Sequence, residues 1–258
     1  MFEKIKCFIL DMDGTIYLGN ELFSFTKDFL KKVDETGRKY YFFTNNSSKS
    51  QQDYIEKLER FGIRIKRQQM MTSTHVISRY LKQHYEGKSV YVLGTPSLIQ
   101  EFQYFDMNLT EEDPDIVVLG FDTTLTYEKL SKACHYIRNG CIYFGINPDW
   151  NCPMEGGAFI PDCGSMAKLI EASTGRFPEF FGKPSKHTLD YIIQETGYEP
   201  DEIAIVGDRL YTDIAVADQS DVTSILVLSG ESTREDVKTS DVKPNVILED
   251  LSEITKML

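Results

Sequence analysis

Short apolar runs alternate along this chain with longer segments that have a helical period. The predicted strands are Cys7–Leu10, Tyr40–Phe43, Val90–Leu93, Ile116–Leu119, Ile142–Ile146, Glu179–Phe181, Ile203–Val206, Ile225–Leu228 and Val246–Leu248. The predicted helices are Phe25–Glu35, Ser50–Phe61, Thr74–His84, Ser97–Phe102, Tyr127–Asn139, Ser165–Thr174, His187–Thr196, Leu210–Gln219 and Leu251–Met257. Strands that alternate with helices form parallel βαβ units, which predicts an α/β fold with a doubly wound parallel sheet.

The composition is that of a folded, acidic protein. The chain has 258 residues, of which 41% are hydrophobic and 26% are charged, and its formal net charge is −12. These fractions are typical of folded proteins, and the negative charge argues against nucleic-acid binding. No apolar run approaches the ~18 residues of a membrane span, and the first residues lack the apolar region of a signal peptide. We therefore expect a cytoplasmic protein with no nucleic-acid or membrane partner.

Residue types that carry chemistry gather near the two ends of the chain. They lie before residue 49 and again from Lys183 to Asp213, whereas the middle has strands and helices of its own but no full catalytic set. Chain ends that meet in one domain are compatible with an inserted domain. We predict a Rossmann-like core made of residues 1–79 and 180–258, with a smaller α/β cap domain inserted over residues 80–179.

Two carboxylates follow the first predicted strand directly. Asp11 and Asp13 come after Cys7–Leu10, on a turn that also contains Gly14. A strand this apolar is typical of the centre of a parallel sheet, and such sheets bind ligands beyond the carboxyl ends of their strands. Carboxylates at that point can hold a divalent metal and leave one oxygen to attack a substrate. Taken alone, the pair is equally well explained as an Asp-rich turn.

Small polar residues follow the strand predicted over Tyr40–Phe43. Thr44, Asn45 and Asn46 supply a hydroxyl, two side-chain amides and backbone N–H groups near a predicted helix start. Such donors suit the oxygens of an anion. The same residue types cap ordinary helices, and that explanation is favoured for this segment in isolation.

A lysine and two further aspartates follow later strands. Lys183, framed by glycine and proline, comes after Glu179–Phe181, and its ammonium group can neutralise a phosphate unless it is an ordinary loop lysine. Asp208 comes after Ile203–Val206, and Asp213 lies on the first turn of the next predicted helix. Asp208 can complete the oxygen ligands of a metal, while Asp213 can hold Lys183 or a metal-bound water.

All four motifs share one position, directly behind an apolar strand. The carboxyl ends of parallel strands converge at one crevice of the sheet, where carboxylates, anion donors and a cation would meet. Each motif taken alone could be an ordinary turn, helix cap or loop. Those explanations do not account for the position of all four motifs directly behind apolar strands. The sequence therefore predicts one active site built from all four.

Together the motifs resemble those of the haloacid dehalogenase (HAD) superfamily of phosphohydrolases. In chain order they are Asp11-x-Asp13-Gly14-Thr15, Thr44-Asn45, Lys183-Pro184 and Gly207-Asp208-x-x-x-x-Asp213. The unbroken Thr44-Asn45-Asn46-Ser47, the long insert before Lys183 and the Asn147-Pro148-Asp149 segment are similar to the para-nitrophenyl phosphatase branch, often called NagD-like (subfamily IIA). The resemblance covers essentially the whole chain, although it is looser in the cap domain.

The resemblance implies a hydrolase that cleaves small phosphate monoesters with Mg²⁺ as its cofactor. Asp11 is then the nucleophile that forms an aspartyl-phosphate, and Asp13 is the general acid and base. Lys183 steadies the nucleophile and the transferring charge. Mg²⁺ is implied to bind the Asp11 carboxylate, the Asp13 backbone carbonyl and Asp208. Substrate binding is implied for Gly14, Thr44, Asn45, Asn46 and Lys183, and Asp213 orients the groups around the metal.

Two other functions remain open: a non-catalytic protein that binds phosphorylated metabolites, and a phosphomutase on the same core. A binding protein would be expected to lack Asp11, Asp13, Lys183 or Asp208, and none is missing. Mutase relatives usually carry a helical cap after the first motif, where the segment up to Thr44 is too short for a domain. The expected partner is a small phosphorylated metabolite that the sequence does not specify, and a homodimer through the cap domain stays open.

Two loops of the cap domain are candidates for selecting the leaving group of the substrate. One contains Trp150 and the other contains Cys163. Our hypothesis is that one of these residues or its neighbours contacts substrate. The alternative is that they pack in the core of the cap domain, where tryptophan is common.

Overall fold

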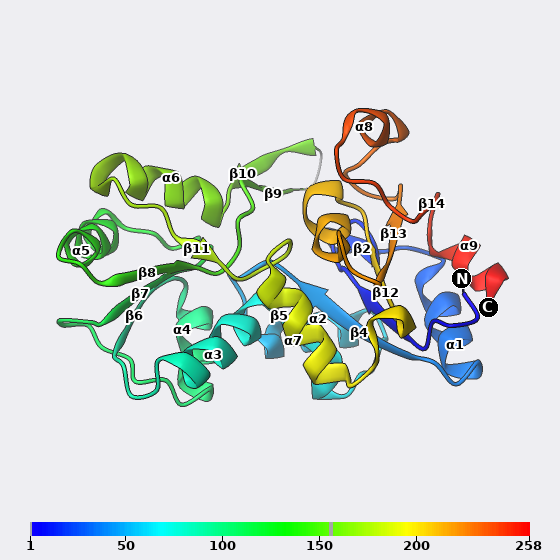
Figure 1. Cartoon of the computed structure of the whole chain (residues 1–258), viewed down its shortest axis with the longest axis horizontal. Coiled ribbons are helices and arrows are strands. Elements are labelled where there is room, and N and C mark those ends of the chain that lie inside the picture. Colours follow the sequence, from blue (N-terminus) through cyan, green and yellow to red (C-terminus); the bar gives the residue numbers. More distant parts are fainter. Residues whose placement is uncertain (1, 155–156) are drawn as a thin grey trace. The chain divides into compact units, whose positions relative to one another are not determined.

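The computed structural model describes residues 2–154 and 157–258, and it divides the chain into two compact units (Figure 1). The first unit contains the chain up to Thr44, residues 55–71 and residues 183–258, and the second unit contains residues 45–54 and 72–182. The predicted domains, 1–79 with 180–258 and 80–179, stay a prediction. Residues 73–79 lie in the second unit, because they begin the helix α3 (Ser73–His84).

A six-stranded sheet forms the first unit, with the strand order β14-β13-β12-β1-β4-β5. Its strands are β1 (Cys7–Leu10), β4 (Lys39–Thr44), β5 (Met70–Thr72), β12 (Ile203–Gly207), β13 (Thr223–Val227) and β14 (Val246–Leu248). β1 is parallel to both of its neighbours, with Leu10 in register with Phe42 on β4 and with Val206 on β12. From β1 the chain proceeds outward through β4 and β5, whereas β12, β13 and β14 lie in succession on the other side. The strand order therefore reverses between β1 and β12, which is where ligands of such sheets bind.

The core of the first unit is built on β1, all four residues of which are buried. Phe8 packs edge-on against Phe29 of α1 (Thr26–Glu35), with 5.7 Å between ring centroids. The buried residues of α1 are Thr26, Phe29, Leu30 and Val33. Their spacing presents one face of the helix, as expected for an amphipathic helix on a sheet. α9 (Leu251–Met257) contacts α1 and buries Leu251 and Ile254.

The segment after β12 departs from the sequence prediction. Leu210–Gln219 was predicted as a helix, but Leu210–Ile214 forms a π-helical turn and Ala215–Ala217 a 3₁₀ turn. Such turns are frequent at functional sites. The physical reason lies in Asp213, whose side chain must turn back toward the strand end, as described below.

The remaining elements of the first unit are short, apart from α7 (Lys186–Thr196). They are the hairpin strands β2 (Tyr17–Leu18) and β3 (Glu21–Leu22) and the helix α8 (Arg234–Thr239). The helix α2 (Gln51–Arg60) begins in the second unit and ends in the first. β2, β3, β5 and α8, which have two to six residues each, were not predicted from the sequence.

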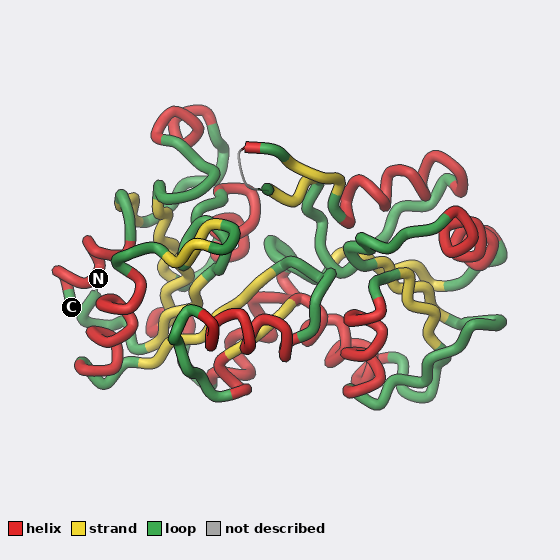
Figure 2. Tube along the Cα trace, turned by 180° about the vertical axis from the view of Figure 1, so that it is seen from behind, coloured by secondary structure: helices red, strands yellow, loops and turns green. Residues whose placement is uncertain are grey.

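The second unit contains a four-stranded sheet with the order β11-β8-β7-β6. Its strands are β6 (Val90–Leu93), β7 (Ile116–Leu119), β8 (Ile142–Gly145) and β11 (Glu179–Phe180), and its helices are α3, α4 (Pro96–Tyr104), α5 (Tyr127–Arg138) and α6 (Cys163–Thr174). Helices lie on both sides of these parallel strands (Figure 2). A small hairpin, β9 (Asn151–Pro153) with β10 (Phe159–Pro161), was not predicted. None of the helices in the described ranges is long and apolar enough to cross a membrane.

Replacing Phe8 by alanine tests whether β1 is the centre of the first unit. Phe8 is completely buried, so the cavity should lower the free energy of unfolding by about 3–5 kcal/mol. Urea denaturation followed by circular dichroism measures this change. Tyr127→Ala is the control because Tyr127 is 84% exposed, and it should change stability by less than about 0.5 kcal/mol. Equal losses in both variants would contradict the placement of β1.

Candidate active site

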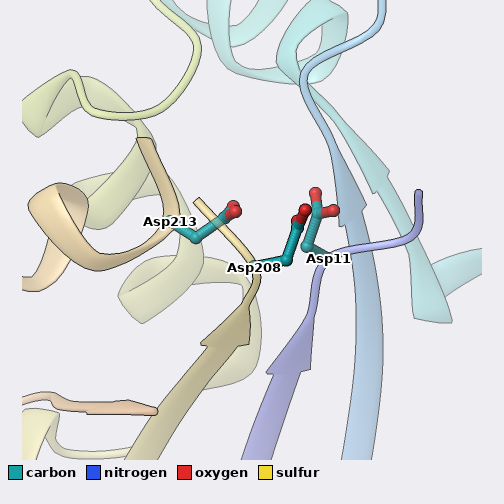
Figure 3. A group of neighbouring side chains, drawn as sticks. All are labelled: Asp11, Asp208 and Asp213. Carbon is teal, nitrogen blue, oxygen red and sulfur yellow. The ribbon is translucent and has the colours of Figure 1, made fainter. Parts of the chain in front are cut away.

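Asp11 and Asp208 lie side by side because β1 and β12 are adjacent parallel strands. The backbone N–H of Asp11 donates to the carbonyl of Val206 at 2.9 Å, which continues the ladder one residue past β1. Asp208 follows the last residue of β12 directly. Figure 3 shows the two carboxylates at the ends of their strands, with Asp213 approaching from the neighbouring helical turn. The side chain of Asp11 is 14% exposed, and Asp208 is almost completely buried.

Lys183 connects two of these carboxylates. Its ammonium nitrogen Nζ donates to Asp11 Oδ1 at 2.7 Å and to Asp213 Oδ1 at 2.5 Å. Nζ also donates to the backbone carbonyl of Phe43 at 3.3 Å, next to the end of β4. Lys183 is only 2% exposed, so these groups replace the water that an ammonium ion would otherwise bind. The structure thus places Lys183 in the charge cluster and not in an exposed loop.

Both carboxylate oxygens of Asp213 are engaged within the protein. Oδ1 accepts from Lys183, and Oδ2 accepts from the backbone N–H of Arg209 at 3.1 Å. The side chain also lies so close to Gly207 that a Cβ atom there would be 2.3 Å from the Asp213 Cβ. This inward position requires the π-helical turn in place of the predicted helix. In this position Asp213 also accepts a hydrogen bond from Lys183 and so holds the ammonium group in place.

The charges in the cluster do not balance. Burial and the neighbouring Asp213 carboxylate raise the pKa of Asp11 to about 7, although Lys183 acts in the opposite direction. Burial and the charges of Asp11 and Asp213 raise the pKa of Asp208 well above its usual range. Burial alone would lower the pKa of Lys183, but Asp11 and Asp213 outweigh it and hold that pKa above its usual value. The charges of Lys183 and Arg209 thus only partly offset those of the three carboxylates, and the cluster favours a further positive charge.

The donor atoms fit a hard divalent cation. Asp11, Asp208 and Asp213 each offer a carboxylate oxygen within 4.8 Å of the others. Asp208 Oδ1 is buried and has no hydrogen-bonding partner within residues 2–154 and 157–258. A buried carboxylate oxygen without a donor is costly, and a metal ion would satisfy it. Carboxylate oxygens are also the ligands that Mg²⁺ and Ca²⁺ prefer.

Asp13, Gly14 and Thr44 also lie in the first unit. Asp13 is partly exposed, and its Oδ1 accepts a long hydrogen bond of 3.4 Å from the backbone N–H of Gly19. Gly14 has a φ of +87°, and a Cβ atom there would lie 2.3 Å from Asp208 Oδ2. Thr44 is buried at the end of β4. Gly14 therefore lies against Asp208, and Thr44 ends the strand next to β1.

Asn45 and Asn46 lie in the second unit, in contrast to Thr44. Asn45 Nδ2 donates to Asp149 Oδ2 at 2.9 Å, and that oxygen also accepts from Asn147 Nδ2 at 2.8 Å. Asn46 Oδ1 accepts from the backbone N–H and the hydroxyl of Ser48. Each amide thus has protein partners in the structure, and the one on Asn45 belongs to a buried polar network.

Cys163 and Trp150 differ in their exposure. Cys163 is completely buried in the core of the second unit, and its thiol lies 3.4 Å from the carbonyl of Leu119. Burial also raises the pKa of this thiol. The packing explanation therefore holds for Cys163, whereas Trp150 is 49% exposed.

Sequence reasoning missed several residues that contact the cluster. Arg209 lowers the pKa values of Asp11 and Asp208 through its charge, though less than burial raises them. The segment Ser229–Glu231 contacts both the loop at Gly14 and Asp208. This segment follows a predicted apolar strand, which is the same signal that found the four motifs.

The first unit is thus a parallel α/β sheet with a buried lysine–carboxylate cluster at the point where its strand order reverses. The sequence profile of the haloacid dehalogenase-like hydrolases matches residues 8–108, and a second HAD-hydrolase-like profile matches residues 180–254. A curated relative is 33% identical over 97% of both chains. The chain belongs to the haloacid dehalogenase-like hydrolases.

Several proteins similar to this chain are named as phosphatases or as NagD. The curated relative is the acid sugar phosphatase of Staphylococcus aureus. Among solved structures, a 4-nitrophenylphosphatase from Thermotoga maritima is 42% identical, covers 99% of this chain and 98% of its own, and superposes with a TM-score of 0.95. NagD from E. coli is 30% identical, covers 96% and 98%, and has a TM-score of 0.88. The predicted superfamily, its NagD-like branch and the α/β fold class are confirmed. The predicted enzyme class, a phosphatase of this family, is confirmed as well.

The pKa of Asp11 predicts a pH-dependent stability in the metal-free protein. Unfolded Asp11 ionises near pH 3.8 and folded Asp11 near pH 7, so the folded state holds an extra proton between these values. Asp11 should therefore lower stability progressively as pH rises through this window. Asp11→Asn removes the effect, so its melting temperature in EDTA should exceed that of the wild type by several degrees more at about pH 8 than at about pH 5. A difference that does not change with pH would contradict the raised pKa.

Proposed function

We propose that this protein is a Mg²⁺-dependent phosphatase that hydrolyses small phosphate monoesters through an aspartyl-phosphate on Asp11. The observation that carries the proposal is the Asp11 carboxylate at the reversal point of the sheet, held by Lys183 and adjacent to Asp208. Membership of the haloacid dehalogenase-like hydrolases and the phosphatase names of its relatives support it.

In the first half-reaction, a carboxylate oxygen of Asp11 attacks phosphorus and the bond to the leaving oxygen breaks. Lys183 holds Asp11 Oδ1 at 2.7 Å, which fixes the rotation of the carboxylate before substrate arrives. Asp13 donates a proton to the leaving oxygen, so that an alcohol departs instead of an alkoxide. The product of this step is a phosphoryl group on Asp11 and an ionised Asp13.

In the second half-reaction, water attacks the phosphoryl group on Asp11. Asp13 now takes the proton that water loses, so inorganic phosphate departs and both aspartates return to their starting states. Lys183 stays paired with Asp213, which keeps the ammonium group in place while charge moves on Asp11. Two easier steps thereby replace direct attack of water on the ester.

Mg²⁺ would be held by the carboxylates of Asp11 and Asp208 with the backbone carbonyl of Asp13, and it would neutralise charge on the phosphoryl oxygens. Asp208 Oδ1, which has no hydrogen-bonding partner among the residues that the structure describes, supports this set. Gly14, Thr44, Asn45 and Asn46 complete the proposed phosphate site with Lys183. The name of the Staphylococcus aureus relative makes sugar phosphates the first class of small phosphorylated metabolite to test.

Asp11→Asn should abolish the reaction. The amide cannot form the acyl phosphate, so the rate with para-nitrophenyl phosphate and MgCl₂ should fall by about 10³-fold or more. Release of nitrophenolate measures the rate, and EDTA should suppress the wild-type activity until Mg²⁺ is restored. Asp190→Asn is the matched control, because Asp190 is exposed on α7. Wild-type turnover in Asp11→Asn, or turnover that survives metal removal, would refute the mechanism.

Lys183→Met should reduce both activity and stability. Methionine preserves the volume of the side chain but leaves Asp11 and Asp213 without their shared cation, which typically costs about 3–5 kcal/mol. The pKa of Asp11 should rise further, because Lys183 lowers it in the wild type. Steady-state kinetics and urea denaturation measure the two effects. Lys186→Met is the control on an exposed position, and both variants behaving alike would argue against the proposed role of Lys183.

A further inference from the structure

The segment after β13 is attached to both halves of the acidic site in the first unit. Ser229 Oγ donates to the backbone carbonyl of Gly14 at 2.7 Å. The backbone N–H of Ser232 donates to the carbonyl of Asp208 at 3.1 Å, and its Oγ accepts from the N–H of Leu210. Residues 229–232 are therefore fixed against the loops that follow β1 and β12.

The same segment distinguishes the two carboxylate oxygens of Asp208. The backbone N–H of Glu231 donates to Oδ2 at 2.7 Å. Oδ1 is buried and has no hydrogen-bonding partner in the part of the chain that the structure describes. A backbone donor has little freedom to move, so this hydrogen bond fixes the rotation of the carboxylate and leaves Oδ1 to an external ligand.

Gly230 is required by space. A Cβ atom at Gly230 would lie 2.0 Å from Asp208 Oδ2 and 2.5 Å from its Cγ. The φ angle of Gly230 lies outside the left-handed region, so the obstacle that an alanine would meet here is the close contact with Asp208. Gly14 also lies close to this oxygen, because a Cβ atom there would be 2.3 Å from it. The Asp208 carboxylate is thus in close contact with two separate stretches of backbone.

The side chain of Glu231 is attached to the residues that follow Asp208. The hydroxyl of Tyr211 donates to Glu231 Oε1 at 2.9 Å, and Arg209 Nε forms an ion pair with Oε2 at 2.8 Å. The Glu231 side chain is 41% exposed, and exposed pairs of this kind contribute little to stability. Their effect is to hold the Glu231 backbone, and with it the N–H, at a fixed distance from Asp208.

We propose that Gly230 and Glu231 are positioning residues for Asp208, which direct its Oδ1 to the divalent cation. The proposal rests on the metal site of the proposed function. It adds to that site two residues from the segment that follows β13. Groups that orient the ligands of a metal typically change its affinity by about 10- to 100-fold when they are altered.

Titration of the full-length protein with MnCl₂ tests the proposal without any turnover, with free Mn²⁺ followed by electron paramagnetic resonance. Gly230→Ala should weaken Mn²⁺ binding by about 10- to 100-fold, because the new methyl group displaces the Asp208 carboxylate. Glu231→Ala keeps the backbone N–H but loses both anchors, so its binding should weaken less, by a few-fold. Mg²⁺ should compete with Mn²⁺ in the wild type.

Two control variants separate positioning from stability. Gly197→Ala introduces a methyl group into open space at a φ of +69°, so it should lower the melting temperature and leave Mn²⁺ affinity unchanged. Glu235→Ala removes an exposed ion pair with Lys238 on α8 and should change neither quantity. Circular dichroism reports whether each variant is folded.

Wild-type Mn²⁺ affinity in folded Gly230→Ala or in Glu231→Ala would overturn the inference and leave the proposed function intact. If Gly230→Ala does not fold, Glu231→Ala decides alone. Asp208→Asn tests whether Mn²⁺ binds at Asp208, because this variant should lose the Mn²⁺ binding that the wild type shows. A wild type that binds no Mn²⁺, or binds it unchanged in Asp208→Asn, would overturn the inference together with the metal site of the proposed function.

Discussion

The hydrogen bonds of Lys183 to Asp11 and Asp213 are the interactions on which the site depends. Three carboxylates at one strand edge could not stay buried and ionised without a cation, because each would lose its water and repel the others. Lys183 offsets part of this cost, and the two carboxylates in turn keep its ammonium group charged. The compensation is incomplete, as the raised pKa values of Asp11 and Asp208 show. This residual negative charge favours the binding of a further cation.

The parallel sheet is what brings these groups together from distant parts of the sequence. Asp11 and Asp208 are neighbours because Leu10 is in register with Val206 and both strands end at the same edge. Lys183 returns the chain to the first unit after the second, and Ser185 caps α7 just beyond it. Residues 72–182 can therefore form a second unit, together with residues 45–54, without separating Asp11, Lys183 and Asp208.

The sequence was most informative where strands are buried on both faces. β1, β6 and β7 were predicted to the residue, because a strand whose residues are all buried admits little but apolar residues. The hairpin of β9 and β10 was not, since three mostly exposed residues in each strand show no pattern. The helix predicted over Leu210–Gln219 was wrong for a tertiary reason: its apolar spacing is helical, but Asp213 is held by Lys183 and Arg209.

Asp11 and Asp208 could be predicted because each follows a buried apolar strand of the core sheet. Lys183 was predicted for the same reason, but the structure places it after β11, a short strand in the sheet of the second unit. Ser229–Glu231 stands in the same relation to β13, yet its residue types are those of an ordinary turn. Its contribution is made by a backbone N–H and by the absence of a side chain at Gly230. A backbone N–H and a missing side chain are not functional side chains. A motif search based on functional side chains would therefore not select the segment Ser229–Glu231.

Thr44 and Asn45 show that adjacent residues of one motif can serve different parts of a structure. Thr44 ends β4 in the first unit, whereas the amide of Asn45 donates to the buried Asp149 carboxylate in the second. Asp149 Oδ2 has Asn45 and Asn147 as its donors, and losing one of them would leave a buried charge poorly solvated. Replacing Asn45 would therefore disturb this network as well as any contact with phosphate. The network provides a physical reason for an asparagine at this position that is independent of the substrate.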